Sequence, residues 1–281
     1  MYYSKEFDIL LSDHPAWRYL PDMRSVRAVR DPGGEHRIIT LSHCGASRFV
    51  AESPLRTDVE SPSFTVVDCE SIQGKTRLVM QLRSMRKVGR LANNDVWDAL
   101  ANSIIRQVIR ATHARKLYTT ACESFGDRID FADCELSLFP TAEQFLRLTD
   151  EELIRAGLSF KISALRAAAR YTLENDALLS SFSPTELAVE LQSIPRVGAW
   201  TAHATVSDMT NNFSWYPYGD LAVRTWASRM DSSRNWPRTD TEFAAAWHHV
   251  SRGDVSRWTI STLAYGVQHG GSRPTTSRVE A

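Results

Sequence analysis

Asp220 stands at the point where a turn meets a predicted helix. In the segment YPYGDLAVRTWASRM, Pro217 and Gly219 predict a turn that delivers Asp220 to the first position of the helix. A carboxylate held there can orient a water molecule and offset the positive charge that develops on a sugar when a bond to its anomeric carbon breaks. The same carboxylate is also a good N-cap, which stabilises a helix by about 1 kcal/mol. One side chain can serve both roles.

A second segment, LQSIPRVGAWTA at residues 191–202, predicts two helices joined by a tight turn. Pro195 ends the first helix, and Gly198 is expected to permit the turn from which the second helix starts. Unpaired backbone N–H groups at such a helix start bind a phosphate oxygen without reading the base sequence. A Pro and a Gly between helices are more often only a connection, so both interpretations stay open.

Other segments that suggest a ligand site lack a necessary residue. The sequence GKT at residues 74–76 is no phosphate-binding loop, because Cys69 stands where its first glycine would be needed. His248 and His249 point in different directions on a helix and lack a third ligand, so no metal centre is predicted. The cysteines form no CxxC pair, and we interpret all four as buried thiols: Cys44, Cys69, Cys122 and Cys134.

The elements that must position these residues change in character near residue 88. Residues 1–88 contain short β-rich runs (SVRAVRD, HRIITLSH, SRFVAES, SFTVVDCE and TRLVMQLRS) and predict an antiparallel sheet. Residues 89–270 have an apolar period of about 3.6 and predict helices. The tail at residues 271–281 has the composition of a disordered segment. Helix starts are expected near Asp95, Thr141, Thr149, Ser159, Ser183, Gly198, Asp220, Thr239 and Ser256.

Composition and charge limit the class of protein. The chain has 281 residues, 43% of them hydrophobic, and no apolar run approaches the roughly 18 residues of a membrane span. Its start lacks the apolar core of a secretory signal, which predicts a cytoplasmic protein, associated with the nucleoid in a bacterium. A net charge of zero argues against nucleic acid. Residues 121–194, however, carry 6 basic and 13 acidic side chains, which leaves an excess of positive charge for the remainder.

In combination, IPRVGAWTA and YPYGDLAVR resemble the hairpin and catalytic-aspartate loop of the helix-hairpin-helix DNA glycosylases, specifically the branch of 3-methyladenine DNA glycosylase II. VWDALANSIIRQVIRATHARKL at 96–117 is similar to the helix pair of that branch that carries a gap-filling Gln and apolar side chain, here Gln107 and Val108. The segment FPTAEQFLRLTDEELIRAGLSFKISALRAAAR, at residues 139–170, also resembles the corresponding part of that branch. The resemblance covers residues 97 to about 270. It implies an α+β fold in which two helical subdomains flank a DNA cleft and an N-terminal antiparallel sheet forms a further domain.

The resemblance implies an activity and partners. Asp220 is expected to be the catalytic carboxylate of a monofunctional DNA N-glycosylase that acts on double-stranded DNA in base excision repair and removes a damaged base, an alkylated purine. Trp200 stands where bifunctional members carry a Schiff-base lysine, so no lyase activity is expected. No cysteine follows residue 134, so no iron–sulfur cluster is expected. A monomer that requires no cofactor is expected, and the resemblance allows a monovalent cation at the hairpin.

The implied site has two parts. Trp200 is expected to form one face of the base pocket and to favour positively charged bases, unless it only braces the hairpin. Lys161 either touches phosphate or is a solvated lysine at a helix start. The implied pocket residues are Trp200, Ala204, Tyr218 and Trp258. The implied DNA-binding residues are Pro195, Arg196, Val197, Gly198, Ala199, Thr201, Gln107, Val108 and Lys161.

Two positions depart from the family pattern. Arg196 replaces the first glycine of the usual Pro-Gly-x-Gly hairpin, where its side chain either adds a phosphate contact or obstructs one. Ala204 stands where the alkylation-repair branch often has a tyrosine, which widens the expected pocket and allows a bulkier adduct. The candidate replacements for that aromatic wall are Tyr216, Tyr218, Trp226 and Trp258, although residues at such spacing are more often core.

Two other functions fit parts of the sequence. An N-glycosidase of nucleotides or another non-duplex substrate would suit the neutral charge and the altered hairpin. A non-catalytic DNA-binding module would use the hairpin alone, but it would give Asp220 no purpose beyond capping. Duplex affinity measured against salt separates these functions, because phosphate binding weakens steeply with salt.

Overall fold

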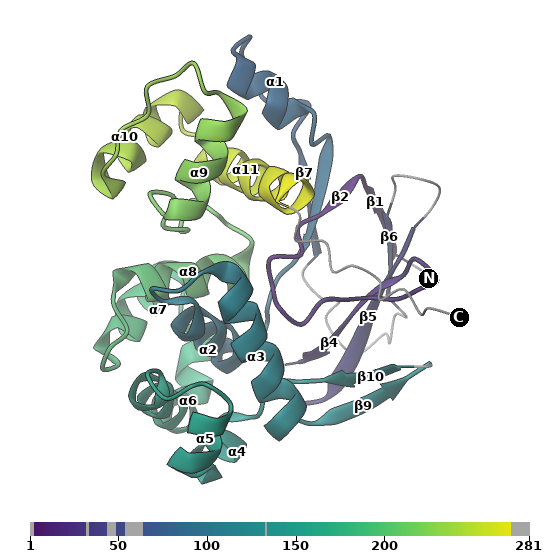
Figure 1. Ribbon diagram of the computed structural model, residues 1–281, viewed down its shortest axis with the longest axis vertical. Coiled ribbons are helices and arrows are strands. Elements are labelled where there is room, and N and C mark those ends of the chain that lie inside the picture. Colours follow the sequence, from purple (N-terminus) through teal and green to yellow (C-terminus); the bar gives the residue numbers. More distant parts are fainter. Residues whose placement is uncertain (1–2, 32–33, 44–48, 54–63, 133, 271–281) are drawn as a thin grey trace.

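A computed structural model describes residues 3–31, 34–43, 49–53, 64–132 and 134–270, in an α+β arrangement (Figure 1). The larger sheet has the strand order β1-β6-β5-β4-β3, and every pair in it is antiparallel. The predicted tail at 271–281 and Cys44 lie outside the described residues. The strands of the larger sheet are β1 (Tyr3–Phe7), β3 (Arg18–Tyr19), β4 (Ser25–Arg30), β5 (His36–His43) and β6 (Phe49–Ser53).

A second, three-stranded sheet departs from the antiparallel prediction. It contains β2 (Ile9–Leu10), β8 (Lys87–Leu91) and β7 (Phe64–Asp68) in the order β2-β8-β7. β7 and β8 are antiparallel, but β2 pairs with β8 in parallel, with Ile9 opposite Val88. The N-terminal segment therefore leaves the larger sheet after β1 and joins the smaller one.

Two further predictions of secondary structure were wrong. The segment expected to be a fifth strand is α1 (Arg77–Arg83), capped by Thr76, whose hydroxyl accepts a hydrogen bond from Val79 N at 3.3 Å. Leu78, Val79 and Leu82 are its buried residues, and this spacing suits one face of a helix. The region expected to be wholly helical contains a hairpin of β9 (Arg128–Phe131) and β10 (Cys134–Ser137).

Seven helices pack around one core in the lower part of Figure 1. Asp95, Thr141, Thr149, Ser183 and Gly198 are N-caps as expected, whereas the helix predicted to start near Ser159 is capped by Lys161. The helices are α2 (Val96–Arg106), α3 (Ala111–Phe125), α4 (Ala142–Arg147), α5 (Asp150–Arg155), α6 (Ile162–Ser181), α7 (Pro184–Glu190) and α8 (Ala199–Thr210).

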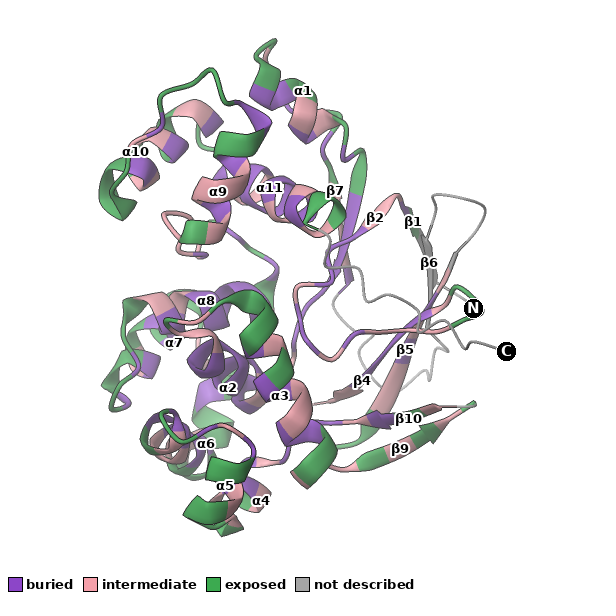
Figure 2. Cartoon of the chain, viewed as in Figure 1, coloured by how far each residue is buried: buried purple, intermediate pink, exposed green. Residues whose placement is uncertain are grey.

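The last three helices form a second core, which they share with the β-rich region. α9 (Leu221–Met230) and α10 (Asp240–Ser251) begin at the predicted caps Asp220 and Thr239, and α11 (Val255–His269) begins after Asp254, near the expected Ser256. Leu11, Cys69 and Val88 belong to this core together with side chains of α9, α10 and α11. Much of α11 is coloured purple, as buried, in Figure 2, and this helix contacts both β7 and β8. β8 also crosses residue 88, the expected domain boundary.

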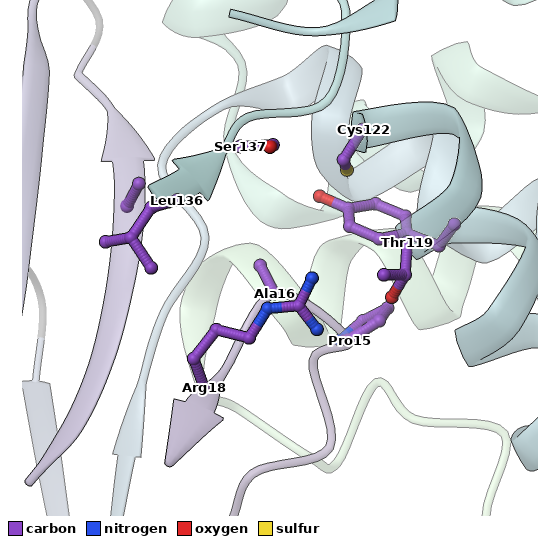
Figure 3. Close-up of a pocket in the computed structure, with 9 residues that line it drawn as sticks. Pro15, Ala16, Arg18, Thr119, Cys122, Leu136 and Ser137 are labelled. Carbon is purple, nitrogen blue, oxygen red and sulfur yellow. The ribbon is translucent and has the colours of Figure 1, made fainter. Parts of the chain in front are cut away.

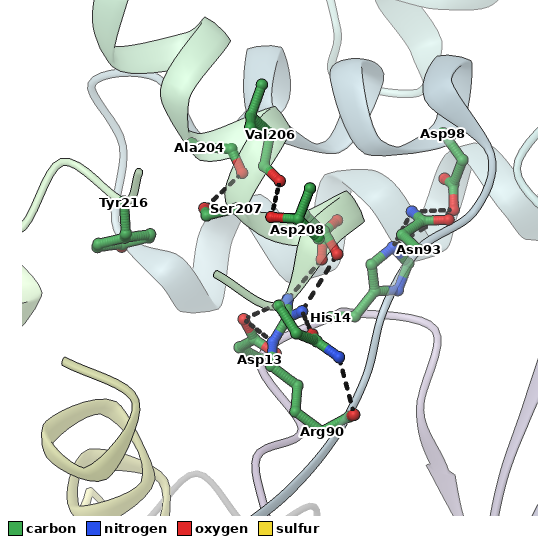
Figure 4. A network of polar contacts seen from close by, with 12 residues as sticks. Asp13, His14, Arg90, Asn93, Asp98, Ala204, Val206, Ser207, Asp208 and Tyr216 are labelled. Atoms are coloured by element: carbon green, nitrogen blue, oxygen red, sulfur yellow. Dashed lines mark hydrogen bonds and ion pairs between the residues drawn. The ribbon is translucent and has the colours of Figure 1, made fainter. Parts of the chain in front are cut away.

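A buried ionic network joins the N-terminal segment, β8 and α8 (Figure 4). Arg90, only 2% exposed, donates to both carboxylate oxygens of Asp13 at 3.1 and 3.3 Å from Nε, and its Nη2 also contacts Asp208 Oδ1. A neighbouring buried cluster surrounds Asp98 of α2, which accepts hydrogen bonds from Tyr118 at 2.6 Å and Asn93 at 3.0 Å. Within the described part of the chain, no helix is both long and apolar enough to span a membrane.

Candidate active site

The predicted hairpin lies between α7 and α8. A short 3-10 turn, Leu191–Ser193, follows α7, and α8 starts after Gly198. We expected Gly198 to make the turn, but this prediction was wrong. Gly198 has the ordinary extended values φ −93° and ψ 179°. Arg196 instead adopts φ +69°, in the left-handed region that disfavours residues with a side chain. Arg196 thus occupies a glycine-type conformation, and its side chain is exposed.

The start of α8 is open to a ligand. No side chain caps it, so the N–H groups of its first turn are not satisfied by a capping hydroxyl or carboxylate. A Cβ atom placed at Gly198 would meet nothing within 4 Å, which leaves free space directly at the helix start. Such a site suits the oxygen of a phosphate group.

The carboxylate of Asp220 accepts hydrogen bonds from two donors, Ala222 N and the indole of Trp200, at the start of α9. Its Oδ2 accepts a hydrogen bond from Ala222 N at 3.1 Å, and its backbone N–H donates to Pro217 O at 2.7 Å. Its Oδ1 accepts a hydrogen bond from the indole Nε1 of Trp200 at 3.2 Å. The carboxylate therefore caps α9 and at the same time faces the helix that follows the hairpin.

The turn that carries Asp220 is fixed against α10. A Cβ atom added to Gly219 would lie 2.6 Å from the backbone oxygen of Asp240, which is closer than real contacts allow. Asp240 also pairs with Arg224 of α9, with Nη2 and Oδ1 2.9 Å apart. The position of Asp220 thus depends on a close backbone approach that only glycine permits.

A pocket of about 520 Å³ opens in front of Asp220. This volume lies in the range of ligand pockets in proteins. Aromatic side chains dominate its wall, and Asp220 and Asp240 are its two carboxylates. The lining residues are Trp200, His203, Ser214, Trp215, Tyr216, Pro217, Tyr218, Gly219, Asp220, Asp240, Thr241 and Ala244.

Gln107 and Val108 form the tip of the turn between α2 and α3. Val108 is fully exposed (102%) and has φ +64°, a conformation that is strained for a β-branched residue. Gln107 Nε2 donates to Thr201 Oγ1 at 2.7 Å and to Arg196 O at 3.3 Å. The tip is therefore attached to the hairpin, one residue away from Trp200.

Lys161 supports the same tip from the start of α6. Its ammonium group donates to Gln107 O at 2.9 Å, and the residue is only 4% exposed. Burial lowers the pKa of Lys161, because the charged form loses its hydration. Lys161 is therefore not the solvated lysine considered from the sequence, and it fixes Gln107 in place.

Solved structures share this fold. The chain is similar to a 3-methyladenine DNA glycosylase from Archaeoglobus fulgidus, with a TM-score of 0.73 and 18% identity over 95% of this chain and 98% of the other. An 8-oxoguanine glycosylase/lyase from Clostridium acetobutylicum, in complex with double-stranded DNA, gives a TM-score of 0.68 and 14% identity over 92% and 90%. The fold is that of the helix-hairpin-helix DNA glycosylases.

A third structure covers less of the chain. The 3-methyladenine DNA glycosylase of Schizosaccharomyces pombe, in complex with abasic DNA, gives a TM-score of 0.51 and 18% identity over 69% of this chain and 92% of the other. No family model matches the sequence, and no curated protein matches it. The helix-hairpin-helix glycosylase fold expected from the sequence is confirmed by structural similarity over almost the full length.

Within this glycosylase fold, the predicted pocket residues separate into two groups. Trp200 and Tyr218 line the pocket, and so does Tyr216. Trp258 does not, since it is buried against Trp247 in the second core, with ring centroids 5.7 Å apart. Ala204 is likewise buried and is not among the lining residues.

Trp226 is also structural. It packs against Tyr265 of α11, with ring centroids 6.2 Å apart, and a Cβ added to Gly266 would lie 2.4 Å from its Nε1. The core interpretation is therefore correct for Trp258, whereas Trp226 is half-buried beside α11 and does not line the pocket. The expectation that they replace a missing wall of the pocket is wrong.

His203 and Trp215 supply that wall instead, and neither was among the pocket residues predicted from the sequence. Their rings make a T-shaped contact with centroids 5.8 Å apart. His203 follows Trp200 by three residues, so helical periodicity alone would have placed both on one face of α8. Trp215 lies two residues before Pro217 of the aspartate turn and carries no comparable signal.

Arg106, the last residue of α2, contacts the pocket wall. Its Nη2 donates to the hydroxyl oxygen of Tyr216 at 3.3 Å. Burial raises the pKa of Tyr216 to about 12, although the charge of Arg106 acts in the opposite direction. The ring of Tyr216 also stacks on Phe213, with centroids 5.4 Å apart and an angle of 20°. Tyr216 is thus a rigid, neutral part of the wall.

A second cavity in the described part of the chain is much smaller. A cavity of about 10 Å³ between the N-terminal segment and α3, lined by Ala16, Arg18 and Cys122, is about the size of one water molecule (Figure 3). No group of three His, Cys, Asp or Glu residues suited to a metal ion occurs among the described residues. Cys69 and Cys122 are buried as expected, but Cys134 is only half-buried.

Proposed function

We propose that the chain is a DNA N-glycosylase that removes a positively charged, alkylated purine by hydrolysis. The observation that carries the proposal is the position of Asp220. Its carboxylate lies on an aromatic pocket, is oriented by Trp200, and is close in the fold to an open helix start suited to phosphate. Similarity to solved glycosylases supports the same reaction class.

The contacts of the DNA-facing residues support a duplex substrate. A base inside a duplex is shielded, so it must rotate out of the stack at a cost of a few kcal/mol. Val108 is exposed at the tip and would fill the space left by the base. Because Gln107 bonds Thr201, and Trp200 bonds Asp220, the tip and the carboxylate are held in a fixed relation.

The pocket supports a cationic base. Aromatic faces attract a cation through their quadrupole, each by about 0.5 to 2 kcal/mol. Trp200, Trp215 and Tyr218 line the pocket with two carboxylates. A neutral base would gain stacking but not this electrostatic term, so we expect a preference for N3- or N7-alkylated purines.

The proposed reaction is a hydrolysis at the anomeric carbon. The bond from this carbon to the base nitrogen breaks, and its electron pair neutralises the alkylated base, which leaves without needing a proton. Asp220 stabilises the positive charge that develops on the sugar, while an oxygen of water forms the new bond. The proton of that water passes to Asp220 or to solvent, which leaves an abasic site.

The lining residues also support hydrolysis without strand cleavage. A lyase step needs an amine that forms a Schiff base with the sugar. No lysine is among the described residues that line the pocket, and Lys161 is engaged with Gln107. We therefore propose a monofunctional enzyme, and borohydride should trap no adduct between protein and DNA. As a separate proposal, the enzyme acts as a monomer without a cofactor.

The test is a panel of duplexes that each carry one lesion, incubated with the protein and then cleaved with alkali at abasic sites. Release of 7-methylguanine or 3-methyladenine ahead of hypoxanthine and 8-oxoguanine supports the proposal. Release of neutral lesions alone would contradict the cationic substrate class. Duplex binding without release of any base would instead indicate a non-catalytic module, and the absence of both would favour a non-duplex substrate.

A further inference from the structure

Of the two carboxylates that line the pocket, Asp240 is the one with an oxygen still available. Its Oδ1 pairs with Nη2 of Arg224 at 2.9 Å, and its Oδ2 has no hydrogen-bond or ionic partner in the described part of the chain. Both oxygens of Asp220 already accept a hydrogen bond, one from Trp200 and one from Ala222 N. Asp240 therefore offers an acceptor to a bound molecule without first losing an existing contact.

Asp240 is also held in a fixed place relative to Asp220. A Cβ atom added to Gly219, the residue before Asp220, would lie 2.6 Å from the backbone oxygen of Asp240. The side chain of Asp240 is anchored by Arg224, which lies in the first turn of α9, the helix that Asp220 caps. It nevertheless remains 74% exposed. The free oxygen is thus positioned by the protein and accessible to a ligand.

Two helices from different parts of the fold contribute to the pocket wall. Trp200 and His203 come from α8, whereas Asp240, Thr241 and Ala244 come from α10, which lies above α8 in Figure 1. The aromatic faces and the free carboxylate oxygen therefore belong to different elements. A flat base can stack on the one while a group on its edge meets the other.

The remaining polar groups of the wall discriminate less between donors and acceptors. Hydroxyl groups such as those of Ser214 and Thr241 can both donate and accept, and an imidazole such as that of His203 has two nitrogens that can differ in role. An ionised carboxylate can only accept. Asp240 therefore favours a ligand group that carries hydrogen and disfavours a carbonyl oxygen at the same place.

Resting on the proposed glycosylase function, we infer that Asp240 recognises the exocyclic amino group of an alkylated adenine or guanine. Adenine carries this donor at N6 and guanine carries it at N2, whereas hypoxanthine has neither. The amino group donates to the free oxygen of Asp240 and holds the base in the pocket that Asp220 also lines. The enzyme thus selects purines that retain an amino group, in addition to selecting for their charge.

The experiment compares three bases with the same methyl group and a similar charge: 7-methylguanine, 7-methyladenine and 7-methylhypoxanthine, each placed in the same duplex. Single-turnover release of each base is divided by its uncatalysed release from that duplex, which corrects for differences in bond strength. We expect the wild-type protein to favour at least one amino-bearing base over 7-methylhypoxanthine by about tenfold or more, because a hydrogen bond to a charged group is strong. In Asp240→Ala this advantage should disappear.

Asp240→Asn makes the test more specific, because an amide has one accepting and one donating group. Arg224 can only donate, so it binds the amide oxygen and turns the amide N–H group toward the pocket. A donor would then face the amino group of the base. We expect the advantage of the amino-bearing bases to be lost in Asp240→Asn as well, although the variant keeps the size of the side chain.

Glu242→Ala is the matched control, because Glu242 is an exposed carboxylate in the same turn of α10 that does not line the pocket. It should keep the wild-type ratios. Each ratio compares bases within one variant, so a general loss of stability affects all rates alike.

The inference is overturned if the wild-type protein releases the three bases at equal corrected rates. It is also overturned if Asp240→Ala or Asp240→Asn keeps the wild-type ratios, even when all three rates fall together, since Asp240 would then act only through its charge. If the wild-type protein releases no base from any duplex, the proposed function itself fails, which is a different outcome from ratios that ignore Asp240.

Discussion

The indole Nε1 of Trp200 donates a hydrogen bond to Oδ1 of Asp220 across 3.2 Å, joining the helix after the hairpin to the helix that Asp220 caps. The other carboxylate oxygen is bonded to Ala222 N. Trp200 is therefore more than a wall of the pocket. It orients the carboxylate, and any movement of α8 on binding DNA would be transmitted directly to Asp220.

Trp200→Phe should separate these two roles. The phenyl ring keeps an aromatic face but lacks the N–H donor, and a hydrogen bond to a charged group contributes about 1.5 to 3 kcal/mol. We expect single-turnover base release to fall by at least about tenfold on charged and neutral lesions alike. Trp200→Ala should add a selective loss on charged bases. An unchanged rate in Trp200→Phe would mean that Asp220 needs no support from the indole.

Asp220→Asn should remove most base release while duplex affinity stays within a few fold. The amide oxygen can still accept the capping hydrogen bond, but the side chain cannot supply negative charge to the transition state, a loss of several kcal/mol. Rates and affinities would be measured on the same lesion duplex. Asp176→Asn, on the exposed side of α6, is the control. Near wild-type release by Asp220→Asn would assign catalysis to another group.

Val108→Gly should raise stability and lower activity. Glycine tolerates φ +64° without the cost of about 1 kcal/mol that a side chain incurs there, and the exposed valine makes no packing contact that would be lost. We expect the free energy of unfolding in urea to rise by up to about 1 kcal/mol. Base release should fall by at least about tenfold, since nothing would occupy the gap left by the base. Val189→Ala, exposed on α7, is the control, and equal activity in both variants would contradict the role of Val108.

Arg196→Gly tests what the unusual hairpin residue contributes. The change relieves the left-handed conformation, so stability should be unchanged or rise by up to about 1 kcal/mol. If the guanidinium contacts a phosphate, the slope of log affinity against log salt should decrease by about 1. Arg147→Ala is the control, because Arg147 is an exposed residue of α4, and it should leave the slope unchanged. A higher affinity in Arg196→Gly would show that the arginine obstructs the phosphate site.

Stability should fall in mild acid because of His14. Burial and the nearby Arg27 lower the pKa of His14, so the unfolded chain binds a proton at a pH where the folded protein does not. Stability is then lost as the pH falls below about 6.5, by at most about 1.4 kcal/mol per pH unit for one group. Denaturant unfolding at pH 7.5 and 5.5 measures the loss. It should be smaller in His14→Gln than in the wild type or in the exposed control His249→Gln.

A second acidic loss follows below about pH 4. Burial alone would raise the pKa of Asp98, but His14, Arg27 and Tyr118 hold it well below its usual range. The unfolded state therefore takes up this proton first, and stability decreases further as the pH falls. Both shifts act in the same direction, because each makes the folded protein bind fewer protons than the unfolded chain.

Local signals in the sequence were sufficient for most helix starts and for the position of Asp220. Caps such as Thr141 and Thr149 act within one turn, so their residue types predict the start directly. α1 was taken for a strand because its residues Leu78, Val79, Met80 and Leu82 suit either structure, and only packing against α9 and α11 decides between them. The parallel pairing of β2 with β8 is equally non-local.

The pocket was harder to predict than the position of Asp220. Trp226 and Trp258 were candidates for the wall because aromatic residues at helical spacing give the same sequence pattern whether they face a ligand or a core. Which side they face depends on the packing of α11, a property of the fold and not of any short segment. The turn residue of the hairpin was misassigned for a related reason, since composition favours Gly198 whereas the backbone places the left-handed conformation at Arg196.

The ionic network around Arg90 also bears on how the molecule unfolds. Arg90 of β8 is fully enclosed between Asp13 of the N-terminal segment and Asp208 of α8, and α11 shares its core with the same sheet. Opening either part alone would leave a charge or an apolar face without its partner, at a cost of several kcal/mol. We therefore expect the sheet and the helices to melt as one cooperative unit, in a single transition, instead of one after the other.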